Sequence, residues 1–325
     1  MTKARKAAAR RCLTTMLLAL FALAWQGCAG TAVRDVPQAR LQAIKHNQRG
    51  VDAGSKGNQD AALAEFTEAL RLHSSIENWD GMVVARINIA RTHRLKGDPA
   101  SARRALERAL LVLPQSTDLA SELFFENAKV YLAAGDLAAA QDWALQAAAA
   151  DKGSELGRRL NLVGAILFRA GSPEQAREKA EQALKLNRDR KVEAEEANSL
   201  RLLGEIHLAQ GREGQAAESF EAALLLDKSL GLAKKIALDL RGLGAAALQK
   251  EDLPAATAYY GRALEVSRSI RDTASAAGDL AQLADLKRRS GDAPAAQKLD
   301  EERAKLTSEE RKLSGPISAR SSTGP

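Results

Sequence analysis

Few side chains in this sequence have the type and spacing that catalysis or metal binding requires. Cys12 and Cys28 are the only two cysteines, which excludes a disulfide framework or a multi-cysteine metal site. Gly242 and Gly244 begin like a dinucleotide-binding loop, but no third glycine follows at the required spacing. The histidines are not paired at the spacing of a helical metal site. There are four of them, His46, His73, His93 and His207. We therefore predict that the protein is not an enzyme, has no catalytic residues, holds no metal and uses no cofactor.

Cys28 is nevertheless a candidate for chemical modification, because of the segment that precedes it. Residues 1–11 are basic without any acid, and residues 12–25 form an apolar run. This pattern is typical of a secretory signal, and the run is shorter than the roughly 20 residues of a membrane span. The sequence Ala24-Trp25-Gln26-Gly27-Cys28-Ala29 resembles the lipobox of bacterial lipoproteins, although Trp25 stands where leucine is usual.

This resemblance implies removal of residues 1–27 as a lipoprotein signal peptide and lipidation of Cys28. Since Ala29 and not aspartate follows the cysteine, it also implies the outer membrane, with the protein facing the periplasm. Ordinary cleavage after Ala32, which would leave a soluble periplasmic protein, is the alternative. An uncleaved signal anchor is a third possibility, which the short apolar run disfavours.

Composition points to an all-helical protein without a nucleic-acid partner. Alanine supplies 65 of the 325 residues and aromatics only 4%, which favours helices over strands. Cleavage of the signal would remove five basic residues and no acid, so the net charge would fall from +7 to +2. Such a chain lacks the basic surface that nucleic-acid binding requires.

The remainder of the chain is one pattern seen seven times. A glycine recurs at spacings of 36 to 40 residues, and Glu251 replaces it in the sixth copy. A small residue stands seven positions before each of these and an alanine five positions after. Four prolines fall two or three residues after this position, where the first turn of a helix tolerates them. They are Pro99, Pro173, Pro254 and Pro294. Each copy therefore predicts two antiparallel helices, with the glycine as the cap of the first.

This pattern resembles the tetratricopeptide repeat (TPR) family over about residues 40 to 305, with a period longer than the family's usual 34 residues. The resemblance implies an all-α superhelical solenoid of about seven helix pairs, in which the first helix of each pair lines a concave face. We expect residues 28–39 to be a tether, residues 40–312 the solenoid and residues 313–325 a disordered tail. The longer period predicts helices lengthened by about one and a half turns.

The family binds peptides or helices with fixed positions of the first helix. Carried onto this chain, those positions predict partner-binding residues in a groove: Asn88, Arg91, Arg94, Phe125, Lys129, Arg158, Asn161, Arg201 and Arg241. Amides can pair with a peptide backbone and arginine with a carboxylate, so a ligand with an acidic or carboxylate-bearing segment is expected. The alternative is that these arginines are simply solvated. The two-residue carboxylate clamp of chaperone-binding relatives is not seen in any copy.

Together these features predict a lipid-anchored TPR adaptor or scaffold that binds protein or peptide partners in envelope assembly, such as pilus, secretion or cell-wall machinery. Two alternatives remain open. One is a regulatory peptide-sensing repeat protein, against which the export signal argues. The other is a secreted repeat subunit without a lipid.

Overall fold

The computed structural model describes residues 38–114, 119–153 and 155–314. The predicted signal peptide, Cys28 and nearly all of the predicted tether and tail lie outside these residues. The described part contains fourteen helices and no strand, so the predicted all-α class is confirmed. The helices form seven antiparallel pairs: α2 (Gln38–Ser55) with α3 (Gln59–Ser75), α4 (Trp79–Leu95) with α5 (Pro99–Leu110), α6 (Leu119–Ala133) with α7 (Leu137–Ala150), α8 (Leu156–Arg169) with α9 (Pro173–Asp189), α10 (Glu193–Ala209) with α11 (Glu213–Ser229), α12 (Ala233–Gln249) with α13 (Leu253–Ser269), and α14 (Thr273–Arg289) with α15 (Ala293–Ser314).

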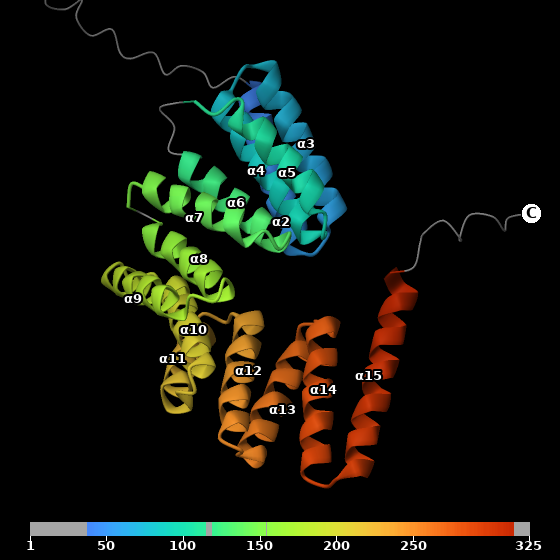
Figure 1. Cartoon of the computed structure of the whole chain (residues 1–325). Coiled ribbons are helices and arrows are strands. Elements are labelled where there is room, and N and C mark those ends of the chain that lie inside the picture. Colours follow the sequence, from blue (N-terminus) through green and yellow to red (C-terminus); the bar gives the residue numbers. More distant parts are fainter. Residues whose placement is uncertain (1–37, 115–118, 154, 315–325) are drawn as a thin grey trace, which may run out of the picture.

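The pairs stack side by side into a curved array, in which α2–α5 lie at one end and α12–α15 at the other (Figure 1). Each helix packs mainly on its neighbours in sequence, and α4 also touches α6, as α10 touches α8 and α12. This is the expected solenoid. None of the helices in the described residues combines the length and apolar character of a membrane span.

One type of turn joins most of the helices. Gly97 illustrates it: its φ of +77° reverses the chain, and the Asp98 N–H then donates to the His93 carbonyl at 2.9 Å. The Asp98 carboxylate accepts the Ser101 N–H at 2.9 Å and so caps the next helix. Pro99 opens that helix, where no N–H is needed. The predicted glycine cap and proline position are both confirmed.

The same turn also connects one pair to the next, which the sequence pattern did not predict. Between positions 171 and 291 a residue with positive φ recurs every 20 residues. Those residues are Gly171, Lys191, Gly211, Gly231, Glu251, Arg271 and Gly291. The six helices between them, α9 to α14, are each 17 residues long, and three residues complete each unit. The 40-residue period is thus two nearly equivalent 20-residue units, and the predicted lengthening of the helices is confirmed.

Small residues on the first helix of a pair make room for aromatic rings from the second. A Cβ added at Gly204 would lie 2.9 Å from the Phe220 ring, and one at Gly244 would lie 2.8 Å from the Tyr260 ring. Where the same position holds alanine, as at Ala90, the second helix instead carries the aliphatic Leu106. In these pairs the two positions are complementary in size, which lets the helix backbones approach closely.

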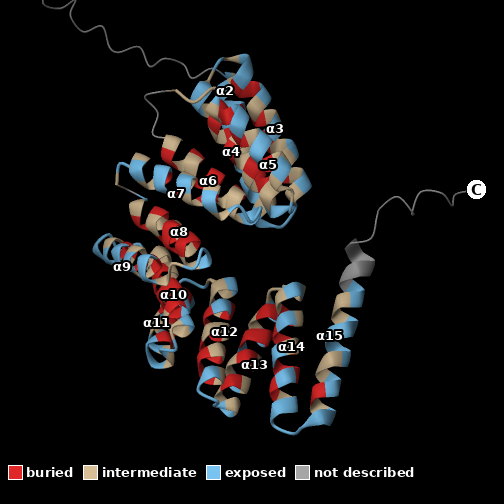
Figure 2. Ribbon diagram, in the orientation of Figure 1, coloured by how far each residue is buried: buried red, intermediate tan, exposed pale blue. Residues whose placement is uncertain are grey.

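The apolar core follows the array as a series of small clusters. One joins α8 to α10 through Val163, Ile166 and Ile206. Another joins α11 to α12 through Phe220 and Leu240. Figure 2 shows buried residues on the facing sides of neighbouring helices and exposed residues on the outer sides. A single pair could not bury its apolar surface alone, so stability depends on stacking.

The sixth copy allows a test of the turn. Glu251 has a φ of +60°, a conformation that costs a residue with a Cβ about 1 kcal/mol. We expect Glu251→Gly to raise the free energy of unfolding by about 0.5 kcal/mol, because the more flexible unfolded chain offsets part of the relief. Urea unfolding followed by circular dichroism measures the change. Gly291→Ala, at a φ of +82°, is the converse control and should destabilise the array. A less stable Glu251→Gly variant would contradict the assignment.

Candidate functional site

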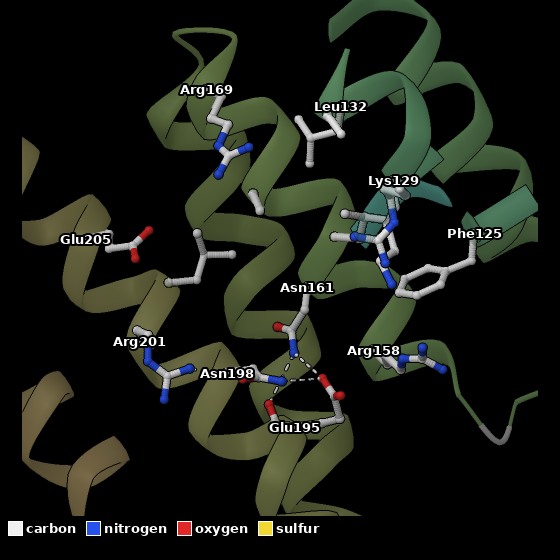
Figure 3. Close-up of a pocket in the computed structure, with 15 residues that line it drawn as sticks. Phe125, Lys129, Leu132, Arg158, Asn161, Arg169, Glu195, Asn198, Arg201 and Glu205 are labelled. Atoms are coloured by element: carbon white, nitrogen blue, oxygen red, sulfur yellow. Dashed lines mark hydrogen bonds between the residues drawn. The ribbon is translucent and has the colours of Figure 1, made fainter. Parts of the chain in front are cut away.

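One hollow on the inner face is a groove walled by α4, α6, α8 and α10, with a volume of about 570 Å³. These are the first helices of four successive pairs, which confirms that the first helices line the groove. Six of the nine predicted partner-binding residues line it: Arg94, Phe125, Lys129, Arg158, Asn161 and Arg201. Figure 3 shows Phe125, Lys129, Arg158, Asn161 and Arg201 around one space. Asn88 and Arg91 do not line this groove, and Arg241 lines a second hollow further along the inner face.

Cationic groups surround an aromatic ring at one side of the groove. The Phe125 ring has the Arg158 guanidinium at 4.3 Å and the Lys129 ammonium at 5.2 Å from its centre. Arg159, which the sequence pattern did not select, lies at 4.4 Å. Such contacts hold the cations in place without neutralising them. We call Arg94, Lys129, Arg158 and Arg169 the basic wall of the groove.

Glu126 compensates part of the positive charge of these side chains. Its fully buried carboxylate accepts from Arg91 at 2.8 Å and from Lys129 at 3.0 Å, and Arg94 lies at 3.7 Å. Burial raises the pKa of Glu126, but Lys129 and Arg91 outweigh it and the pKa is lowered. This carboxylate faces three cations, of which Arg91 is also paired with Glu122, so a positive excess remains beside Arg94 and Lys129.

Arg91 and Asn88 belong to this hydrogen-bonded network and do not line the groove. Arg91 bridges Glu122 and Glu126, at 2.8 Å each, and donates to the Asn88 side-chain oxygen at 3.3 Å. Glu122 also accepts from Arg159 at 2.7 Å. These two predicted residues thus lie in a network that joins α4, α6 and α8, so a role in partner binding remains only a prediction for them.

The opposite side of the groove is acidic and comes from α10. The Glu195 carboxylate accepts from Asn161 at 3.2 Å and from Asn198 at 3.0 Å (Figure 3). Glu205 points into the groove with no hydrogen bond or ion pair inside the described residues, and the protein around it raises its pKa by desolvation. The groove is therefore polarised, with a basic wall facing a glutamate pair. Sequence reasoning missed Glu195, Glu205 and Arg169, because their positions carry no shared chemistry in the other copies.

Behind the groove, three sets of polar residues tie successive pairs together, and we call them the inter-repeat triads. Each takes one residue from the first helix of a pair, one from its second helix and one from the first helix of the next pair. The members recur at intervals of 40 residues. The triads are Asn161–Asn187–Ser199, Arg201–Asp227–Asp239 and Arg241–Ser267–Asp279.

The hydrogen bonds of the triads join helices of the protein to one another. Arg201 donates to Asp239 at 2.7 Å and also to Asp227, and both carboxylates are fully buried. Arg241 donates to Asp279 at 2.6 and 2.9 Å. Neither arginine is simply solvated, so that alternative is wrong for both. Their donors are largely engaged inside the protein, and whether either also contacts a ligand remains a prediction.

An all-α array of antiparallel pairs with a polar inner groove defines the protein as a helical-repeat scaffold. The sequence matches the tetratricopeptide repeat family over residues 41–114 with one profile, and over residues 87–155 and 164–229 with another. The chain belongs to the tetratricopeptide repeat family. Proteins of this family bind protein or peptide partners and are generally scaffolds without enzymatic activity.

Solved structures with the same fold include regulatory and assembly proteins. A signal-transduction ATPase (STAND) with a tetratricopeptide repeat sensor from Pyrococcus horikoshii aligns with a TM-score of 0.64 at 14% identity. The alignment covers 83% of this chain but only 43% of the ATPase. A Rap protein complexed with Competence and Sporulation Factor aligns with a TM-score of 0.63 at 14% identity, covering 83% and 77%. The APC/C hetero-tetramer Cut9–Hcn1 aligns at 0.57 and 18%, covering 70% and 40%.

At these identities the likeness concerns the fold alone. The sequence matches none of the curated proteins with which it was compared. Within the described residues, no three His, Cys, Asp or Glu side chains are grouped so that they could hold a metal ion.

The Arg201 triad predicts a pH-dependent stability. Burial and the nearby Asp227 raise the pKa of Asp239 from 3.8 to about 7, although Arg201 opposes the shift. Because the folded-state pKa lies above the unfolded one, this contribution to stability is present below about pH 4 and is lost as the pH rises through 7. Between pH 6 and pH 8 the loss is about 1.4 kcal/mol for one group with this pKa.

We expect Asp239→Asn to remove this dependence, so that urea unfolding of the variant changes less between pH 6 and pH 8 than that of the wild type. Asp227→Ser should act in the same way, because it reproduces the Arg241 triad, in which Ser267 takes this place. Equal pH dependence in the wild type and both variants would contradict the prediction.

Proposed function

We propose that this protein is a lipid-anchored adaptor of the bacterial cell envelope that binds an acidic or carboxylate-bearing segment of a protein partner in its inner groove. The basic wall of the groove is the observation that carries the binding proposal. The Arg158 guanidinium lies 3.4 Å from a carboxylate oxygen of Glu122 and of Glu155. Both distances are long for an ion pair, so its pairing is loose. Arg169 is exposed and has no ion pair within the described residues. Both can take up a ligand carboxylate without breaking a buried pair.

The proposed location rests on the sequence before the first described helix. The basic segment, the apolar run and the lipobox-like residues before Cys28 support export, cleavage and lipidation. With two or more acyl chains, attachment would be durable, since each buried methylene contributes about 0.8 kcal/mol. An outer-membrane anchor would leave the array in the periplasm, where it could join envelope machinery such as a pilus, a secretion system or the cell-wall apparatus.

The anchor has a direct test. We expect the wild-type protein in the membrane fraction and extractable only by detergent, while Cys28→Ser should lose the acyl label after growth with a fatty-acid probe and become soluble or remain unprocessed. The cysteine at position 12 is an internal control, because Cys12→Ser should leave labelling unchanged. Recovery of the wild-type protein from the cytoplasm would contradict the proposed location and would favour the regulatory alternative.

The groove is tested by charge reversal at Arg158 and Arg169, neither of which pairs with a fully buried carboxylate. We expect the double variant Arg158→Glu, Arg169→Glu to lose the envelope proteins that the native protein captures after cross-linking in intact cells. Arg201 and Arg241 are unsuitable for this purpose, because their removal would leave buried carboxylates unpaired and destabilise the array.

The matched control is Lys185→Glu, Lys228→Glu, with the same change in net charge. These two lysines are exposed on α9 and α11, the second helices of their pairs, and do not line the groove. Circular dichroism of both variants is the check that they are folded. If the groove variant, the control and the wild type capture the same envelope proteins, the partner contact lies elsewhere and the groove proposal is wrong.

A further inference from the structure

The groove does not end at α10, because a second hollow of about 540 Å³ lies between α10, α12 and α14. Leu208, Leu238, Gly242 and Ala245 contribute to its lining. The only charged side chains among its lining residues are Glu205 and the pair Arg241–Asp279, which is already satisfied within a triad. This part of the inner face is therefore predominantly apolar, in contrast to the basic wall.

In this hollow, helix α12 provides an exposed apolar side chain. Leu238 is 48% exposed, although it faces the concave side. Gly242, one turn further on, packs directly on the Phe220 ring, where an added Cβ would lie 2.5 Å from the ring carbons. The Phe220 ring fills the space that a side chain at this position would take, so the ring and the glycine backbone together line the hollow. Such a surface suits an apolar side chain of a ligand, whose burial would be favourable.

Glu205 is the residue that connects the two hollows, because it lines both of them. Its carboxylate has neither a hydrogen bond nor an ion pair within the described residues, although the Arg169 and Arg201 guanidinium groups act on it from the groove side. An exposed carboxylate at this junction, without a hydrogen bond or ion pair in the described residues, is suited to receive a cationic group from a ligand.

We propose that the inner face recognises a partner segment with three features in succession: an acidic group on the basic wall, a basic group opposite Glu205, and an apolar side chain in the hollow over Gly242. This inference rests on the proposed binding function and adds the specificity. The order follows from the positions of the sites, since the junction residue lies between the basic wall and the apolar hollow. A segment that is acidic throughout would meet Glu205 with like charge and would be disfavoured.

Selection from a random peptide display library tests this pattern, with the full-length lipoprotein purified in detergent as the target. Selected peptides should carry an acidic residue, then a basic residue, then an apolar residue, in one chain direction. Their dissociation constants, measured by fluorescence anisotropy, should rise at least tenfold with Glu205→Arg and with Leu238→Asp. Glu218→Arg is the control for Glu205, because Glu218 is exposed on α11 outside both hollows, and it should leave affinity unchanged.

A charge swap separates recognition by Glu205 from a general loss of folding. If the basic residue of a selected peptide is replaced by glutamate, binding to the wild type should weaken, and binding to Glu205→Arg should be restored. Restoration supports the direct contact, and its absence overturns it.

Two outcomes distinguish this inference from the proposed function. Selected peptides that are acidic only, and that respond to Arg158→Glu but not to Glu205→Arg or Leu238→Asp, would overturn the three-part pattern and leave the groove proposal standing. Failure to enrich any peptide, or enrichment of peptides whose binding ignores Arg158→Glu and Arg169→Glu as well, would overturn both.

Discussion

Successive helix pairs in this array are held in place by hydrogen bonds between buried polar side chains, on which the shape of the groove depends. A pair of helices cannot bury its apolar faces alone, and apolar contact by itself is tolerant of sliding. The inter-repeat triads remove this freedom, because Arg241 must reach Ser267 on its own pair and Asp279 on the next. Breaking such a set leaves a buried charge unpaired, which is costly. The triads therefore fix the position of each repeat relative to the next, and apolar packing supplies the stability.

The triads also explain how the inner face combines structure with recognition. Each first helix carries both kinds of residue, and neighbouring positions on one helix face differ in role. Arg201 is committed to Asp227 and Asp239, whereas Glu205, one turn later, has no partner within the described residues. Because the committed side chains fix the helices, the free ones are held in fixed positions along the groove. A preorganised surface of this kind binds an extended segment without a large cost in ordering.

Much of the fold could be predicted from the sequence, and so could part of the groove. The seven pairs, the glycine caps and the proline positions follow from local rules about φ, hydrogen bonding and helix geometry, which act within a few residues. Asn161, Arg201 and Arg241 recur every 40 residues, but the partners of these side chains stand 26 and 38 residues further along the chain. Only the stacking of helices brings them together, so their role in the fold was not visible in the helix pattern.

By itself the sequence determined the class of fold and the number of helix pairs. It did so because a repeated pattern of small residues, caps and apolar positions has only one regular solution. The tertiary structure decided which charges are satisfied and which are free. Arg159 and Glu205 entered the site, whereas Arg91 and Asn88 moved behind it, since pairing depends on distances between different helices. Electrostatic character is thus a property of the assembled inner face, because each charge is set by neighbours that are distant in the chain.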